Sequence, residues 1–259
     1  MNNFMNFMAK EMLEAWRRKR FLVLSIVFLF VALISPTMTR YINEFLELLI
    51  PAEDLNAMGV MLLTPHWSTS YQSFYMNLNQ IGMIALILLG MGIVVSEVRR
   101  GTAALMMVKG LTHTTFMLVK FAAFSLMVFV VLLISLLLQH FLTLAFFGAG
   151  AAVGNLILGF ALYWLFSMMI ISLIIFTSTI AQSVGMAAVF GILGFMAFSI
   201  PAGLPRLREP FPYTLSARAH EITTAGYVSE FLWLNILTAI LTTALFLAAS
   251  ILILRKKEL

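Results

Sequence analysis

One short basic segment, 97–120, holds the residues of this 259-residue chain that are best suited to chemistry. It begins at Glu97, has no other acidic residue, and carries the cations Arg99, Arg100, Lys109 and Lys120. An apolar stretch, 103–108, lies among these cations between Gly101 and Gly110. A short helix with apolar anchors and a charged rim can fill a groove on another protein. The segment therefore predicts protein docking, and the alternative is simple contact of its cations with lipid headgroups.

The other groups with reactive potential are too dispersed to predict an active site. The chain has no cysteine, which excludes thiolate catalysis, disulfides and cysteine-ligated metals. It contains no phosphate-binding G-x-x-x-x-G-K-[ST], no H-E-x-x-H and no G-x-S-x-G. The histidines are spread along the chain at His66, His113, His140 and His220. We predict no catalytic residue, no metal ion and no cofactor in this chain.

Two alternatives to a docking protein stay open. A membrane-embedded enzyme acting on lipid or peptide would need an acid–base set, and the only candidates are Glu209, His220, Glu221 and Glu230. A non-catalytic immunity or sensing subunit of a membrane would need no such set.

The composition of the chain indicates a membrane protein. The chain is 62% hydrophobic and 10% charged, with a mean hydropathy of +1.01, whereas soluble domains carry about 25% charged residues. Crossing about 30 Å of hydrocarbon takes about 20 apolar residues in a helix. The sequence predicts an all-α membrane protein, one domain over 1–259, with six transmembrane helices at about 21–38, 79–96, 121–147, 156–177, 184–200 and 231–254.

The basic residues orient these spans. The two tails and the 97–120 loop hold twelve of the sixteen Lys and Arg residues: Lys10, Arg17, Arg18, Lys19, Arg20, Arg99, Arg100, Lys109, Lys120, Arg255, Lys256 and Lys257. The positive-inside rule then places both termini in the cytosol. Segments 39–78 and 201–230 are predicted to be extracytoplasmic. The net charge of +5 follows from this bias and does not indicate nucleic-acid binding.

The segment before the first span, 1–20, has helical amphipathicity. Its apolar residues fall on one side and its charged residues on the other, which predicts a helix lying in the cytosolic membrane interface. An ordinary basic flank with chance periodicity is the alternative.

Polar residues near the span ends mark the outer third of the membrane. They are Asn79, Gln80, Gln139, His140 and Asn235. They predict an outer vestibule or, alternatively, hydrogen bonds that hold helices together. The spans carry no ionisable residue at mid-bilayer, which argues against an ion-coupled transporter.

Four stretches in this order resemble one family. They are the basic amphipathic start running into Ser35-Pro36, N-L-N-Q-I-G at 77–82, E-V-R-R-G-T at 97–102 with Lys109, Phe116 and Lys120 following, and the proline-rich region 202–230. Together they resemble the type-2 ABC transporter permeases, the six-span membrane subunits of bacterial ABC exporters. One departure is His113, which stands near the position where the family often has an arginine.

That resemblance implies a partner and a source of energy. A separate cytosolic ATPase, holding ATP and Mg, would dock on 97–120 and drive a pathway formed with a second, identical or related permease. The residues expected to touch it are Arg99, Arg100, Gly101, Thr102, Leu105, Met107, Lys109, His113 and Lys120. Gly101 would break the helix, Thr102 would cap the next one, and Glu97 would orient the loop by holding Arg100 or Lys109. The cargo would be a hydrophobic or amphipathic compound, and the location the bacterial cytoplasmic membrane.

Overall fold

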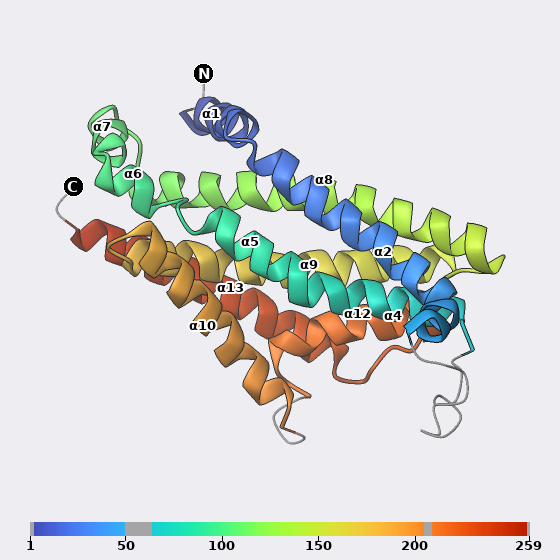
Figure 1. Ribbon diagram of the computed structural model, residues 1–259. Coiled ribbons are helices and arrows are strands. Elements are labelled where there is room, and N and C mark those ends of the chain that lie inside the picture. Colours follow the sequence, from blue (N-terminus) through green and yellow to red (C-terminus); the bar gives the residue numbers. More distant parts are fainter. Residues whose placement is uncertain (1–2, 50–63, 205–208, 258–259) are drawn as a thin grey trace.

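Six long apolar helices make up the protein in the computed structural model, which describes residues 3–49, 64–204 and 209–257. The candidate spans are Arg20–Leu46, Trp67–Arg99, His113–Phe147, Val153–Ile180, Val184–Pro201 and Leu232–Lys256. No described residue lies in a β-strand. The prediction of an all-α, multi-pass membrane protein is confirmed. Figure 1 shows both termini at one end of the bundle. We call it the basic end, because the helices that meet there carry Lys10, Arg99 and Lys256.

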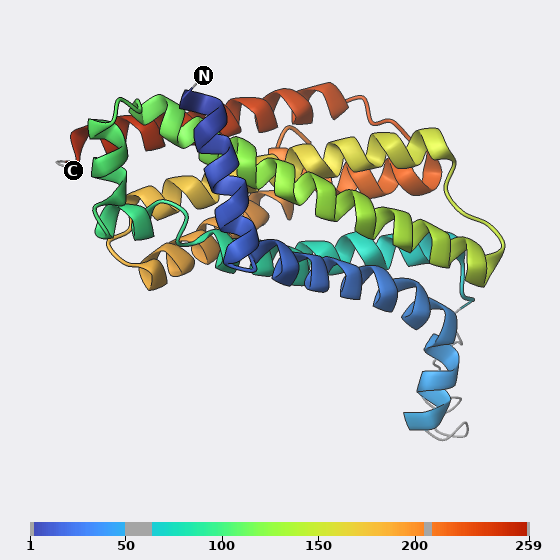
Figure 2. The same cartoon turned by 90° about the horizontal axis from the view of Figure 1, so that it is seen from above.

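The first two helices meet at a sharp elbow. α1 (Asn3–Arg17) crosses the bundle at a steep angle to α2 (Arg20–Leu49) and α8 (His113–Phe147), as Figure 2 shows. α2 packs on α8 and continues well past the predicted end of the first span at residue 38. Pro36 lies inside it, and the backbone leaves helical geometry only at Tyr41, where Figure 2 shows the helix bending away.

The second span is longer than predicted, contains one π-helical turn and is broken once. It consists of α4 (Trp67–Asn77), a π-helical turn (Leu78–Gly82), α5 (Met83–Gly90) and α6 (Val95–Arg99). The helix begins at Trp67, twelve residues before the predicted start of the span at residue 79. Tyr71, Phe74 and Tyr75 are buried, so the polar stretch before residue 79 is part of the core. Gly90 fits a close approach: a β-carbon there would lie 2.7 Å from both Ile174 and Phe124.

The break between α5 and α6 is closed by the neighbouring helix α9 (Val153–Ile180). The Ser178 hydroxyl accepts from the backbone N–H groups of Val94 and Val95, both at 3.1 Å, and donates to the Met91 carbonyl at 2.8 Å. A helix break inside a membrane is tolerated when a neighbour satisfies the freed backbone groups in this way.

α9 is the centre of the bundle, and it contacts α8, α10 (Val184–Ala202), α12 (Leu215–Ala225) and α13 (Leu232–Lys256). α10 leans away from the other helices in Figure 1, and little of it is buried.

The predicted extracytoplasmic segment 201–230 is in part a component of the bundle. α12 packs against α9 and α4 with Leu215, Ala219 and Ile222 buried. Gly159 of α9 permits this contact, because a β-carbon there would lie 2.0 Å from Thr223 Oγ1 and 2.8 Å from the Ala219 carbonyl oxygen. Residues 50–63 and 205–208, with Arg206 and Arg208, lie outside the described residues.

Candidate functional site

Glu97 is the centre of an ion cluster that joins three segments at the basic end. Its Oε1 lies 2.8 Å from Lys10 Nζ of α1 and 3.0 Å from Lys120 Nζ of α8. Glu97 and Lys120 are 87 and 110 positions away from Lys10 in the sequence, so only folding brings them together. The cluster therefore fixes α1 and α6 to the start of α8.

The ammonium group of Lys10 lies among three carboxylates, in the position that a metal ion would need. Its Nζ lies 2.8 Å from Glu11 Oε1, Glu14 Oε2 and Glu97 Oε1. These three carboxylates also lie close enough together to hold a metal ion. The Lys10 ammonium fills that place and neutralises part of their charge, so the cluster is built as an ion-pair network.

Lys120 is the most deeply buried charge of the cluster, with only 1% of its side chain exposed. Its Nζ lies 3.0 Å from Glu11 Oε1 and 4.9 Å from the centre of the Phe116 ring. Phe116 stacks on Phe7 of α1 at 5.7 Å between ring centres. A cation over an aromatic face is stabilised further, and more so away from water. The polar face of α1 thus points into the protein, whereas Met5 and Trp16 are exposed.

Ionisation of α1 follows from these contacts. Burial would lower the pKa of Lys10, but its hydrogen bonds to Glu11, Glu14 and Glu97 outweigh burial and raise the pKa above its usual value of 10.5. For Glu14, burial alone would raise the pKa, yet the hydrogen bond and charge of Lys10, with the charge of Arg18, lower the pKa below 4.5. Both groups are therefore charged at neutral pH.

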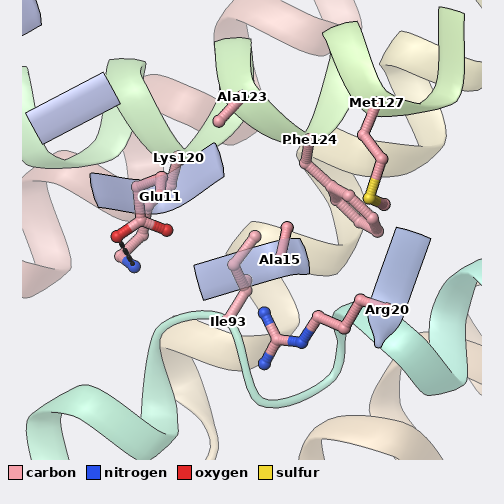
Figure 3. Close-up of a pocket in the computed structure, with 8 residues that line it drawn as sticks. All are labelled: Glu11, Ala15, Arg20, Ile93, Lys120, Ala123, Phe124 and Met127. Carbon is pink, nitrogen blue, oxygen red and sulfur yellow. Dashed lines mark hydrogen bonds and ion pairs between the residues drawn. The ribbon is translucent and has the colours of Figure 1, made fainter. Parts of the chain in front are cut away.

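A small cavity lies beside the cluster, as Figure 3 shows. It is lined by Glu11, Ala15, Arg20, Ile93, Lys120, Ala123, Phe124 and Met127. Its volume of about 20 Å³ has room for roughly one water molecule. The guanidinium of Arg20 approaches Ile93 across it. The cavity is a gap in the packing around the charges and is too small for a transported compound.

The segment that follows Glu97 forms a short exposed helix, α7 (Thr102–Val108). Gly101 precedes it with a left-handed φ of 70°, and Gly110 follows it with a φ of 87°. Thr102 donates from Oγ1 to the Glu97 carbonyl at 3.1 Å. Ala103 is buried against the core, whereas Leu105 and Val108 are 62% and 86% exposed. α7 therefore presents apolar side chains outward from a fixed base.

The predicted docking residues separate into two groups. Arg99, Arg100, Gly101, Leu105 and Lys109 are exposed, and Thr102, Met107 and His113 are partly buried. Lys120, in contrast, faces inward, because both of its carboxylate partners lie inside the protein.

Two predicted roles in the loop are different in the structure. Glu97 holds Lys10 and Lys120, and not Arg100 or Lys109. Gly101 occupies the cap position before α7, so Thr102 is its first helical residue. His113 begins α8, whose cap is Thr112, with Oγ1 accepting from the Thr115 N–H at 3.1 Å.

A groove separates α7 from α1. It has a volume of about 460 Å³ and is lined by Asn6, Phe7, Lys10, Met106, Lys109 and Leu111. Apolar side chains form half of this lining, and the exposed Lys109 gives it a positive charge, whereas Lys10 is paired with three carboxylates. Such a groove matches a segment that has apolar anchors and acidic neighbours.

The polar residues that were predicted to form an outer vestibule make separate contacts with different neighbours. Gln139 is fully buried and donates to Ser70 Oγ at 2.8 Å, and His140 contacts the Tyr71 hydroxyl. Tyr163 donates to Asn79 Oδ1 at 3.3 Å, and Gln80 is exposed.

Asn235 of α13 is also fully buried. It donates to the Glu209 and Phe211 carbonyls and to Thr214 Oγ1. Four of the five predicted vestibule residues thus bind groups of this chain, as helix-joining hydrogen bonds do.

The acid–base residues of the enzymatic alternative lie near α12. Arg218 forms ion pairs with both Glu209 and Glu221. His220 lies beside Tyr75, with 6.3 Å between ring centres, and Glu230 is exposed.

Two functional groupings were missed by sequence reasoning. The amphipathic pattern of 1–20 showed a polar face but not that this face points into the protein. The break at 91–94 had a weak signal in Gly90 and Gly92, and nothing in the sequence pointed to Ser178 as its partner.

No protein-family model matches this chain, and no curated protein matches it.

Proposed function

We propose that this protein is the membrane-spanning permease subunit of an ATP-driven ABC transporter, powered by a separate ATPase that docks on α7. The observation that carries the proposal is α7 itself. Leu105 and Val108 are exposed at the end of the bundle, although α7 is tied at its start to the buried cluster through Glu97. Exposed apolar side chains on a fixed support are typical of a surface that awaits a partner.

The ion cluster connects this surface mechanically to other helices of the protein. A partner that pushes on α7 acts directly on Glu97, whose carboxylate is bound to α1 and α8. The three segments would therefore move as one unit, and the α1–α7 groove would belong to the same docking surface. This is how ATP hydrolysis in a partner could reach helices of the bundle without any nucleotide site in this chain.

The topology and the assembly complete the proposal. Both termini and α7 share the basic end, which the positive-inside rule places in the cytosol. The pathway would form between two copies or two related permeases in a bacterial cytoplasmic membrane. A hydrophobic or amphipathic cargo, such as a drug, peptide or lipid, would leave the cell through it.

The test is co-purification with the ATPase encoded nearest to this chain. We expect Leu105→Asp combined with Val108→Asp to abolish ATPase binding and transport, because both side chains are exposed and their loss should not unfold the bundle. The matched control is Gln182→Asp, which adds a carboxylate to an exposed turn at the basic end outside α7.

Two outcomes would contradict the proposal. If the double variant still binds the ATPase and transports, α7 is not the docking element. If the purified chain converts lipid or peptide without any ATPase, the enzymatic alternative is correct.

A further inference from the structure

The elbow between α1 and α2 carries four consecutive basic residues, Arg17, Arg18, Lys19 and Arg20. The first three are exposed. Arg18 pairs with Glu14 at 2.9 Å. Among the described residues, Arg17 and Lys19 have no ion-pair or side-chain hydrogen-bond partner. Two cations at this elbow are therefore available to a ligand from outside the chain.

Lys19 has a backbone conformation that is unfavourable for a residue with a β-carbon. Its φ of 55° is the only positive value for a non-glycine residue in the described part of the chain. A β-carbon disfavours this conformation, and glycine adopts it without strain. Strain of this kind persists where the side chain serves a purpose. The strained conformation of Lys19 therefore suggests a functional role for its side chain at the elbow.

An exposed apolar stripe passes through the same elbow. On α1, Leu13 and Trp16 are 50% and 69% exposed. On α2, Leu22 and Ile26 are 53% and 59% exposed. The Trp16 and Phe21 rings join the two parts, with 5.9 Å between their centres. Because the polar face of α1 is bound inside the protein, this stripe is left for the bilayer.

We propose that the α1–α2 elbow is a binding site for an anionic phospholipid. Its phosphate would lie at Arg17 and Lys19, and one acyl chain would lie along Leu22 and Ile26. The first candidate span begins at Arg20, so the free cations stand at headgroup level, where anionic lipids attract basic residues. Positive charge above a continuous apolar stripe complements such a lipid, and the inference does not depend on an ATPase.

The probe is phosphatidylglycerol, compared with phosphatidylcholine, bound to the purified full-length chain and counted by native mass spectrometry. We expect the unmodified chain to prefer phosphatidylglycerol. Arg17→Gln and Lys19→Gly should each weaken its binding by on the order of fivefold, the effect of one surface cation. Glycerol phosphate, which has no acyl chains, should not compete.

Lys19→Gly separates a ligand role from a structural one. Removing the strain should leave thermal stability in neutral detergent unchanged or higher, while phosphatidylglycerol binding falls. The control is Arg255→Gln with Lys256→Gln, two exposed cations that also flank a span. This pair should keep the lipid preference.

Three results would overturn the site. They are an unchanged preference in both elbow variants, an equal loss in the control pair, and displacement of the lipid by glycerol phosphate. An elbow that binds an acidic protein segment or a second copy of the chain would give the first of these.

Discussion

Lys120 Nζ on α8 lies 3.0 Å from Glu97 Oε1 on α6, with 1% and 6% of the two side chains exposed. An ion pair this far from water stabilises the fold only if every charge stays partnered. Lys10 and Glu11 complete that condition, because Lys10 binds Glu97 and Glu11 binds Lys120. The pair is thus a joint between segments and a vulnerable point of the structure.

Removing Lys120 should expose that vulnerability. We expect Lys120→Met to destabilise the protein by about 3 kcal/mol, because Glu97 and Glu11 would be left with Lys10 alone. Thermal unfolding in detergent measures the loss. Combining Lys120→Met with Glu97→Gln should cost less than the sum of the single changes, and additive losses would show that the two groups are not coupled.

Gly159 should tolerate no side chain. Gly159→Ala places a methyl group 2.0 Å from Thr223 Oγ1, so α12 must shift, at a cost of about 1–3 kcal/mol. The nearby Gly154→Ala is the control, since nothing lies within 4 Å of a β-carbon there. Limited proteolysis of the 209–231 region and thermal unfolding would report the shift. Equal behaviour of the two variants would argue against the packing of α12 on α9.

Ser178 should matter more than other buried serines of its helix. Ser178→Ala removes the partner of two N–H groups and one carbonyl at the α5–α6 break. Unsatisfied buried groups of this kind cost about 1–3 kcal/mol. Ser172→Ala is the matched control, because Ser172 is fully buried and bonds only within its own helix, to the Met169 carbonyl. Similar melting temperatures for both variants would contradict the proposed closure of the break.

The stability of α1 should depend on pH at both extremes. Glu14 has a lowered pKa in the folded protein, so its contribution is present above the usual value of 4.5 and is lost as the pH falls through the folded value. Lys10 has a raised pKa, so its contribution is present below the usual value of 10.5 and is lost as the pH rises through the folded value. Glu14→Gln should flatten the acid side of the stability profile, and Lys10→Met the alkaline side. Profiles that the two changes leave intact would show that these charges do not hold α1.

Much of the fold could be predicted from the sequence, because membrane spans are recognised by their length and hydropathy. All six predicted spans correspond to helices, and the break at Gly101 is present with the left-handed backbone that glycine permits. The span ends were predicted less well. Residues 67–78 look like a polar surface segment, yet Tyr71 and Tyr75 are buried, and their hydroxyls meet His140 and Thr223.

The candidate site was only partly predictable for a physical reason. The exposed α7 depends on local features, a glycine at each end and apolar residues between. The cluster beneath it depends on which charges meet, and Lys10, Glu97 and Lys120 are far apart in sequence. Amphipathicity describes the two faces of α1 but does not determine which face meets protein and which meets lipid.

The arrangement of the ion cluster has a consequence for how the protein folds during its synthesis. α1 is synthesised before α8, and Lys120 follows Glu11 by 109 residues, which takes roughly 5–20 s on a ribosome that adds 5–20 residues per second. Until then, α1 can satisfy its own charges locally, since Lys10 and Glu14 are one helical turn apart. The charges of α1 can therefore pair with one another before Lys120 has been made. α1 reaches its final place only after the third span has begun to emerge from the ribosome.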